Sequence, residues 1–311
     1  MGDVPAAVHT PVLLAEVIQR LQPHAGMRML DCTLGMGGHA LALAQAGADI
    51  VGIDRDGQAR GLASERFARE GLAGRLTIRA ATFADAVEDC VKNGEHFDGV
   101  LADLGVSSLQ LDHEERGFSW RSETSPDMRM GDGCPETALD LIARSSEEDL
   151  ANILYDFGEE RLSRKVARHI KAAHTAGQLT TNAQLAGVVR AAIPGHHTRH
   201  PAMRTFQALR IAVNDELGQL ERLLAVLPQI TAPGGLAVLI SFHSLEDRAV
   251  KEVLREGLQA GLWADVARKV TTASDEELAV NPRATPAKLR WALRSSATVS
   301  GPLTPTGIRT S

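Results

Sequence analysis

Short apolar runs alternate with stretches of helical spacing along the first third of the chain. The runs have the length of buried strands, and the stretches between them place apolar residues on one face of a helix. The predicted strands are 28–32, 49–53, 76–80 and 99–103, and the predicted helices between them are 38–46 and 57–70. Such alternation predicts parallel strands joined by helices that cover both faces of a sheet.

The strand pattern stops after residue 103 and returns near the end of the chain. Helices are predicted in the gap at 145–155, 161–174 and 182–192. Beyond it we expect helices at 204–226 and 245–256, a turn at 233–235 and strands at 236–242, 266–272 and 288–294. The pattern therefore predicts an α/β fold with a mostly parallel seven-stranded sheet and an inserted α-helical domain. The expected parts are a core in two pieces (1–105 and 204–300), a helical insertion (106–203) and a flexible tail (301–311).

Composition narrows the class of protein. The chain has 311 residues, 44% hydrophobic and 23% charged, as a globular protein does. No apolar run approaches the roughly 18 residues of a membrane span, and the first residues lack the basic start of a signal peptide. Three scattered cysteines match neither a disulfide framework nor a zinc site. We expect a cytoplasmic protein with no membrane partner and no metal.

The charge is unevenly distributed. The net charge is −6, yet residues 161–214 contain nine Lys or Arg and no Asp or Glu. A second acid-free stretch, after Glu277, carries Arg283, Lys288, Arg290 and Arg294. Basic segments of this kind favour a polyanionic partner such as nucleic acid, although chance clustering on solvated helix faces remains an alternative.

A glycine-rich loop follows the first predicted strand. It reads Asp-Cys-Thr-Leu-Gly-Met-Gly-Gly-His from Asp31 to His39, and the second strand ends at Asp54. Glycines let a ligand approach the backbone, the following helix start suits an anionic group, and an acid at Asp54 suits ribose hydroxyls. A dinucleotide site reads G-x-G-x-x-G, whereas the sixth position of this loop, residue 40, is alanine. Asp31 and Thr33 suit the ammonium of S-adenosylmethionine better than a pyrophosphate.

The fourth predicted strand ends at Asp103, on the edge of the sheet where the reacting group belongs. An acceptor that takes a hydrogen bond from an exocyclic amine localises its lone pair and aims it at a methyl donor. Asp103 is the candidate for this role. His243 comes directly after the predicted strand 236–242, so we expect it at the same edge of the sheet. It is a candidate to hold a base or to move a proton. The alternative is that it only makes a structural hydrogen bond. A hydride-transferring dehydrogenase and a non-enzymatic RNA-binding module are the competing classes of function.

Several segments closely resemble one family, the bacterial 16S ribosomal RNA cytosine-N4 methyltransferases of the MraW type. The matching segments are HTPVLLAEV (9–17), DCTLGMGGH (31–39), VGIDRD (51–56), ADLGVSSLQLD (102–112), RGFSW (116–120), DMRM (127–130), YDFGEERLSRKVAR (155–168), RTFQALRIAVNDEL (204–217), SFHSLEDRAVK (241–251), NPRA (281–284) and KLR (288–290). The resemblance implies a class I, Rossmann-like methyltransferase that uses S-adenosylmethionine. It also implies that the substrate is N4 of the cytosine at position 1402, in the decoding region of 16S rRNA within the small ribosomal subunit.

The resemblance also implies the residues of the site. The expected cofactor contacts are Gly37, Gly38, His39, Asp54, Phe83, Asp103 and Gln110. Asp103 and His243 are the expected catalytic residues. Phe118 and Trp120 are candidates to stack on the target base or to anchor the insertion. His196, His197 and His200 favour phosphate contact or a plain loop over a metal, because no further ligand is near in sequence.

Overall fold

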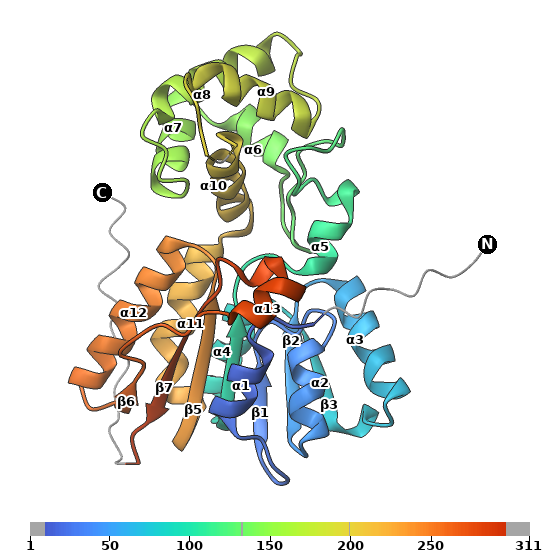
Figure 1. Ribbon diagram of the computed structural model, residues 1–311, viewed down its shortest axis with the longest axis vertical. Helices are drawn as coiled ribbons and strands as arrows, with labels where there is room; N and C mark the ends of the chain where they lie inside the picture. Colours follow the sequence, from blue (N-terminus) through green and yellow to red (C-terminus); the bar gives the residue numbers. More distant parts are fainter. Residues whose placement is uncertain (1–9, 132, 199, 297–311) are drawn as a thin grey trace. The chain divides into compact units, whose positions relative to one another are not determined.

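The computed structural model describes residues 10–131, 133–198 and 200–296, which form two compact units (Figure 1). Of the described residues, 10–105 and 218–296 make up the first, here called the sheet unit. Residues 106–217 make up the second, here called the helical unit. No helix among the described residues is both long enough and apolar enough to cross a membrane.

The sheet unit is built on a seven-stranded sheet with the order β3-β2-β1-β4-β5-β7-β6. Strands β1 to β5 run parallel, whereas β7 is antiparallel to both β5 and β6. The strands are β1 (Arg28–Asp31), β2 (Asp49–Asp54), β3 (Leu76–Ala80), β4 (Phe97–Asp103), β5 (Thr231–Ser241), β6 (Trp263–Val266) and β7 (Lys288–Arg294). The prediction of a mostly parallel seven-stranded sheet is confirmed.

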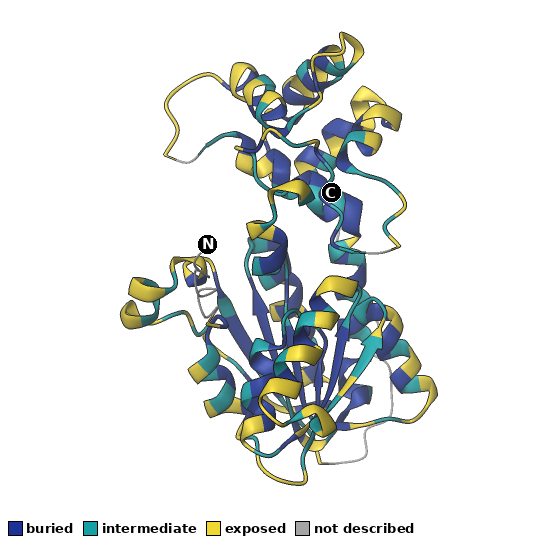
Figure 2. Ribbon diagram, turned by 90° about the vertical axis from the view of Figure 1, so that its right-hand side faces the viewer, coloured by how far each residue is buried: buried dark blue, intermediate teal, exposed yellow. Residues whose placement is uncertain are grey.

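Helices cover both faces of this sheet, as Figure 1 shows. One apolar cluster joins the sheet to α4 (Phe83–Lys92), α11 (Glu216–Ile230) and α12 (Ser244–Gln259), and the other joins it to α1 (Leu14–Leu21), α2 (Gly38–Gln45) and α3 (Gly57–Arg69). Successive strand residues alternate between the clusters, because side chains on a strand point to opposite faces. Leu30 and Val100 belong to the first cluster, and their neighbours Met29 and Leu101 to the second. The central strands β1, β2 and β4 therefore read as mostly apolar runs, and their interiors are buried (Figure 2).

Three central strands end in an acid. Asp31, Asp54 and Asp103 are the last residues of β1, β2 and β4. Because these strands are parallel neighbours, the three side chains come to the same edge of the sheet. Two short elements complete the C-terminal part of the unit, α13 (Asp275–Val280) and a 3₁₀ turn at Pro282–Ala284; another 3₁₀ turn, Ala73–Arg75, precedes β3.

The helical unit packs its helices around one apolar cluster of its own. Its elements are α5 (Ser108–Asp112), a 3₁₀ turn (Glu114–Arg116), α6 (Ala138–Arg144), α7 (Glu147–Asp156), α8 (Ser163–Thr175), α9 (Asn182–Ala192) and α10 (Ala202–Asn214). Hydroxyl side chains begin four of these helices. Ser107, Thr137, Ser146 and Thr181 each accept a hydrogen bond from the first turn that follows.

The second predicted boundary of the insertion, at residue 203, differs from the structure. Residues 204–217 belong to the helical unit, because Phe206, Leu209 and Val213 of α10 are buried in its apolar cluster. The single helix predicted over 204–226 is also wrong, since α10 ends at Asn214 and α11 begins at Glu216. Between them Asp215 adopts a left-handed conformation with φ 51°.

Two smaller predictions of strand and turn positions are wrong. The apolar run at 266–272 contributes only the end of β6 and an isolated bridge from Thr271 to Leu289. The turn predicted at 233–235 lies within β5, where the register against β4 shifts between Phe97 and Gly99. The tail predicted at 301–311 lies outside the described residues.

Replacement of Asn214 tests what ends α10. Its buried side chain accepts from the Met130 N–H (2.9 Å) and donates to the Met128 carbonyl (2.7 Å). Asn214→Ala leaves both backbone groups without that partner and is expected to lower the free energy of unfolding by about 2–3 kcal/mol. Urea denaturation measures the change. The exposed Asn93→Ala serves as the control and should stay within about 0.5 kcal/mol of the parent; an equal loss in both variants would contradict this explanation.

Candidate active site

Thr33 connects the ends of β1 and β4. Its N–H donates to Asp31 Oδ1 (3.0 Å), and its hydroxyl oxygen accepts from the Asp103 N–H (2.7 Å). The hydroxyl itself lies 3.4 Å from Asp31 Oδ1, toward which it donates. One threonine therefore fixes the positions of two strand-end acids.

The glycine loop leads from Thr33 into α2. The Gly35 N–H donates to Asp54 Oδ2 (2.8 Å), which ties the loop to the end of β2. Gly37 has φ 73°, a conformation that other residues rarely adopt. A Cβ on Gly38 would lie 2.6 Å from the Pro11 ring, so the segment before α1 packs directly on the loop. The loop is held closely against both neighbours, with the start of α2 beside it.

His39, the second residue of α2, is buried between the N-terminal segment and Asp103. Its Nε2 lies 2.9 Å from the Val12 carbonyl oxygen, and because that oxygen only accepts, Nε2 carries a proton. Its Nδ1 lies 3.8 Å from Asp103 Oδ2. The three glycine-loop residues predicted as cofactor contacts thus lie at the ends of β1, β2 and β4.

Burial controls the charge of the strand-end acids. Burial, together with the nearby charge of Asp54, raises the pKa of Asp31 to about 7. Burial likewise raises the pKa of Asp103 well above its usual range, with further contributions from Asp31 and Glu246. The pKa of Asp54 is also raised by burial, although the N–H groups of Asp56 and Gly35 oppose the rise. Carboxyl groups that raise one another's pKa form a site that favours a cation.

One oxygen atom of the three strand-end acids has no hydrogen-bond partner among the described residues. Asp103 Oδ1 is buried and makes no hydrogen bond to any described residue, although the Asp103 side chain as a whole is 25% exposed. A buried acceptor without a partner costs free energy that a donor or cation from a ligand restores. S-adenosylmethionine carries both an ammonium and a sulfonium, so Asp31, Asp54 and Asp103 fit its charge. A pyrophosphate fits these residues poorly.

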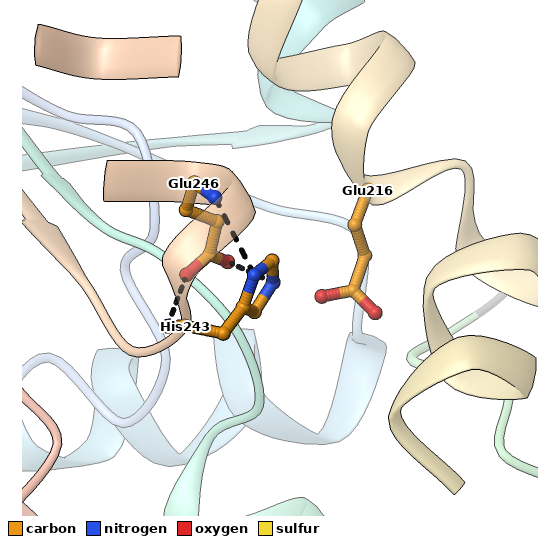
Figure 3. Close-up of side chains that lie close together, drawn as sticks. All are labelled: Glu216, His243 and Glu246. Atoms are coloured by element: carbon orange, nitrogen blue, oxygen red, sulfur yellow. Dashed lines mark hydrogen bonds and ion pairs between the residues drawn. The ribbon is translucent and has the colours of Figure 1, made fainter. Parts of the chain in front are cut away.

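His243 and Glu246 lie where β5 passes into α12 (Figure 3). Glu246 Oε2 accepts from the N–H groups of Phe242 (2.8 Å) and His243 (3.2 Å), and His243 Nδ1 accepts from the Glu246 N–H (3.4 Å). Since Nδ1 is an acceptor, the proton of the neutral ring lies on Nε2. That nitrogen is buried without a hydrogen bond, 3.2 Å from Glu246 Oε1.

This geometry narrows the role predicted for His243. A nitrogen that already carries a proton donates and does not accept, so Nε2 in this tautomer does not take up a proton. The buried Glu246 carboxylate holds the end of β5. The usual Ser/Thr capping pattern misses it because the capping residue is a histidine. Glu216, also drawn in Figure 3, belongs to the helical unit and pairs there with Arg210.

The remaining predicted cofactor residues lie in different surroundings. Phe83 is the first residue of α4 and packs, partly buried, against the apolar cluster of the sheet unit. Gln110 belongs to the helical unit, where its amide accepts from the Ser107 N–H and donates to the Met130 carbonyl. The Gln110 side chain thus caps α5, and contact of either residue with a cofactor stays a prediction.

The aromatic and histidine candidates of the helical unit only partly come together. Trp120 stacks on His200 with ring centroids 4.0 Å apart, and the Arg121 guanidinium lies over the Trp120 ring. Phe118 and Trp120 both pack against the unit's apolar cluster, which supports the anchoring alternative. His196, His197 and His200 form no group of three potential metal ligands within the described part of the chain.

The second basic stretch is engaged inside the sheet unit. Arg290 is buried and donates to Asp247 (2.7 Å), which Lys288 also approaches. Arg294 donates to the carbonyls of Pro228 and Leu262. Of these three cations of β7, Arg290 is therefore buried in an ion pair and does not face a polyanion, whereas contact of Lys288 or Arg294 with a polyanion stays a prediction.

Comparison with known proteins decides the family. The MraW methylase family matches residues 6–295. The chain belongs to this family. It is 49% identical over 290 residues to the ribosomal RNA small subunit methyltransferase H of Sorangium cellulosum, covering 92% of this chain and 90% of that protein. It is 46% identical over 294 residues to the protein of the same name from Acidobacterium capsulatum, covering 91% and 97%.

Within this MraW methylase, the acids give a pH-dependent stability. The raised pKa of Asp31 means that the folded state holds its proton up to about pH 7, whereas the unfolded chain releases it near pH 3.8. The stabilisation is present at low pH and is lost as pH rises through about 7. Asp31→Asn keeps an oxygen acceptor for Thr33 and removes the charge. We expect the stability of the variant relative to the parent to increase by about 3 kcal/mol between pH 5 and pH 8. Urea denaturation at both pH values measures this gain; a pH-independent difference would contradict it.

Substitution of Gly38 tests the packing of the loop. In Gly38→Ala the new methyl group meets the Pro11 side-chain ring, which is closed onto the backbone nitrogen and cannot swing away. We expect a loss of about 1–3 kcal/mol in stability and weaker binding of S-adenosylmethionine by calorimetry. Gly61→Ala, in α3 with no atom within 4 Å of the new Cβ, is the matched control. It should bind like the parent and be as stable or slightly more stable; unchanged binding in Gly38→Ala would remove the loop from the cofactor site.

Proposed function

We propose that this protein transfers the methyl group of S-adenosylmethionine to N4 of a cytosine in the decoding region of 16S ribosomal RNA. Membership of the MraW methylase family and the names of the relatives support an enzyme that methylates small-subunit rRNA. The observation that carries the chemistry is the buried, unpaired Oδ1 of Asp103 at the end of β4. The reaction takes place in the cytoplasm, where small ribosomal subunits are assembled.

The sheet unit supplies the cofactor site. The glycine loop at Gly37 and Gly38 lets a ligand approach the backbone, and Asp54 at the end of β2 offers oxygens for ribose hydroxyls. Asp31 provides negative charge for the ammonium, and Phe83 lies at the start of α4 as a surface for adenine. S-adenosylmethionine supplies the chemistry in the form of a methyl group on a positively charged sulfur.

Asp103 orients the acceptor. The lone pair of a cytosine N4 amine is delocalised into the ring, so the amine attacks only when it is held in line with the methyl group. Asp103 accepts a hydrogen bond from the amine at Oδ1. This hydrogen bond turns the lone pair of the amine toward the methyl group. A cation bound beside Asp31 and Asp103 lowers the pKa of both acids, so Asp103 ionises and becomes the stronger acceptor. The proton that N4 loses passes to Asp103 or to water.

His243 and Glu246 act by positioning. Glu246 holds the backbone at Phe242 and His243, and His243 presents a proton on Nε2. This proton lies toward Glu246 Oε1 (3.2 Å), so His243 serves the extruded base by fixing the loop after β5. Extraction of a base from its stack costs a few kcal/mol, which contacts to the RNA backbone offset.

The direct test of this function is transfer of labelled methyl from S-adenosylmethionine to small subunits that lack the modification, followed by nucleoside analysis. Labelled N4-methylcytidine is the expected product, and naked 16S rRNA in a parallel reaction shows whether an assembled subunit is needed. Label in another nucleoside would overturn the acceptor assignment while leaving the methyltransferase class intact.

Asp103→Asn tests the orienting role in the same assay. The amide keeps the shape of the side chain but not its charge, so we expect turnover to fall at least about 100-fold. Affinity for S-adenosylmethionine should fall far less, because Asp31 and the glycine loop remain. Asp89→Asn, an exposed acid on α4, is the control and should match the parent. Single-turnover kinetics with calorimetry separates the two effects, and a parent-like rate in Asp103→Asn would refute the role.

A further inference from the structure

The corner between α7 and α8 in the helical unit exposes side chains that are usually buried. Tyr155, the only tyrosine in the chain, is 50% exposed near the end of α7, and Leu162, just before α8, is 42% exposed. Three exposed cations accompany them, Arg161, Arg164 and Lys165. We call these five residues the α7–α8 corner. None of them has a role in the site at the strand ends.

Helix packing explains why these residues face outward together. Helix α8 buries Val166, Ala167 and Ile170 in the unit's apolar cluster, and this directs residues 161, 164 and 165 to the opposite side. Helix α7 buries Leu150 and Leu154, which leaves Tyr155 outside.

The two helices run antiparallel, so the corner residues lie at one end of the pair. Arg168 of α8 reaches Glu147 at the start of α7, which places the end of α7 beside the start of α8. The turn between them is firmly held, since the Phe157 carbonyl accepts from Gln207 (3.0 Å) and the Glu159 carbonyl from Arg204 (3.1 Å), both on α10. The corner is therefore a built surface with fixed backbone positions.

The cations of the corner differ from the others in the acid-free stretch. Arg168 pairs with Glu147, Arg210 pairs with Glu216, and Lys171 donates to the Ile142 carbonyl. The side chains of Arg161, Arg164 and Lys165, in contrast, form no ion pair or hydrogen bond with any described residue. The exposed acid at this turn is Glu159, and Asp156, whose pKa burial raises, lies beside Tyr155. The five corner residues thus place three positive charges around an exposed aromatic ring, and the third carboxyl group of the turn, Glu160, is buried and accepts from the Leu162 N–H.

We propose that the α7–α8 corner binds unpaired nucleotides of the ribosomal RNA substrate, with a base stacked on Tyr155 and neighbouring phosphates on Arg161, Arg164 and Lys165. The proposal rests on the proposed function for the identity of the RNA. An aromatic face among unpaired cations matches the two parts of a single-stranded nucleic acid, because each base offers a π face and each linkage a negative charge. An acidic protein surface would use the cations but would leave the tyrosine ring unexplained.

The charge contribution is tested by the salt dependence of binding. The triple variant Arg161→Ala/Arg164→Ala/Lys165→Ala is titrated with a short fluorescein-labelled single-stranded RNA and with small subunits. Loss of three phosphate contacts should reduce the slope of log K against log salt by about 2. The matched control is Arg69→Ala/Lys251→Ala/Arg255→Ala, which removes three exposed cations from the sheet unit. It should keep the parent slope; an equal reduction in both triples would overturn the assignment.

The stacking contribution is tested at Tyr155. Tyr155→Ala should weaken RNA binding about five-fold or more, whereas Tyr155→Phe keeps the ring and should bind like the parent. Thermal unfolding of each variant confirms that the helical unit is intact. Parent-like RNA binding in Tyr155→Ala would refute the stacking, and a defect seen only with whole subunits would assign the corner to a protein partner and overturn the proposal.

These readouts are independent of the proposed function. If the parent enzyme labels a nucleoside other than cytidine, the proposed function fails, but the salt slope and the Tyr155 variants still decide whether the corner binds RNA. If the parent makes N4-methylcytidine and the corner variants bind RNA normally, the inference fails alone.

Discussion

Burial of acidic side chains at one edge of a parallel sheet is the constraint on which the rest of this protein depends. Asp31, Asp54 and Asp103 end neighbouring strands, and burial raises the pKa of each. Carboxyl groups placed in this way are unfavourable when all are ionised. The protein therefore needs Thr33, the Gly35 N–H and His39 around them, and a cation relieves the remaining repulsion.

This constraint connects stability with chemistry. A methyl donor with a positively charged sulfur is the type of ligand that such a site favours. In the proposed reaction, an amine acceptor needs the ionised Asp103 that the same ligand promotes. The helical unit contributes in a different way. Its apolar cluster and capped helices make a rigid support, and the cations of its α7–α8 corner are left without internal partners. Chemistry and RNA contact thus depend on different physical forces in separate compact units.

Much of the fold could be predicted because parallel strands buried on both faces are continuous apolar runs. The strands predicted at 28–32, 49–53 and 99–103 lie at β1, β2 and β4, which are parallel and have buried interiors. The break at Asp215 could not be predicted, because the helical spacing continues through it. The residues that hold Asn214 are Met128 and Met130, which are distant in sequence.

The site also contains some features that local sequence patterns predict and others that depend on residues distant in sequence. The glycine loop and the strand-end acids are local patterns, so the sequence indicates both their position and their charge. The roles of Glu246 and Arg290 depend on long-range packing. Glu246 holds the end of β5 through a capping box that begins with a histidine, and Arg290 pairs with Asp247 instead of facing a polyanion.

The central claim is that buried acids bind the cofactor through its positive charge, and proton exchange measures this directly. Calorimetric titration of the protein with S-adenosylmethionine near pH 7, in buffers of different ionisation enthalpy, gives the number of protons exchanged on binding. We predict a net release of protons on binding, because the ligand lowers the raised pKa of Asp31 and Asp103. S-adenosylhomocysteine, which lacks the charge on sulfur, should release fewer. Binding of both ligands with no proton exchange in any buffer would contradict the account.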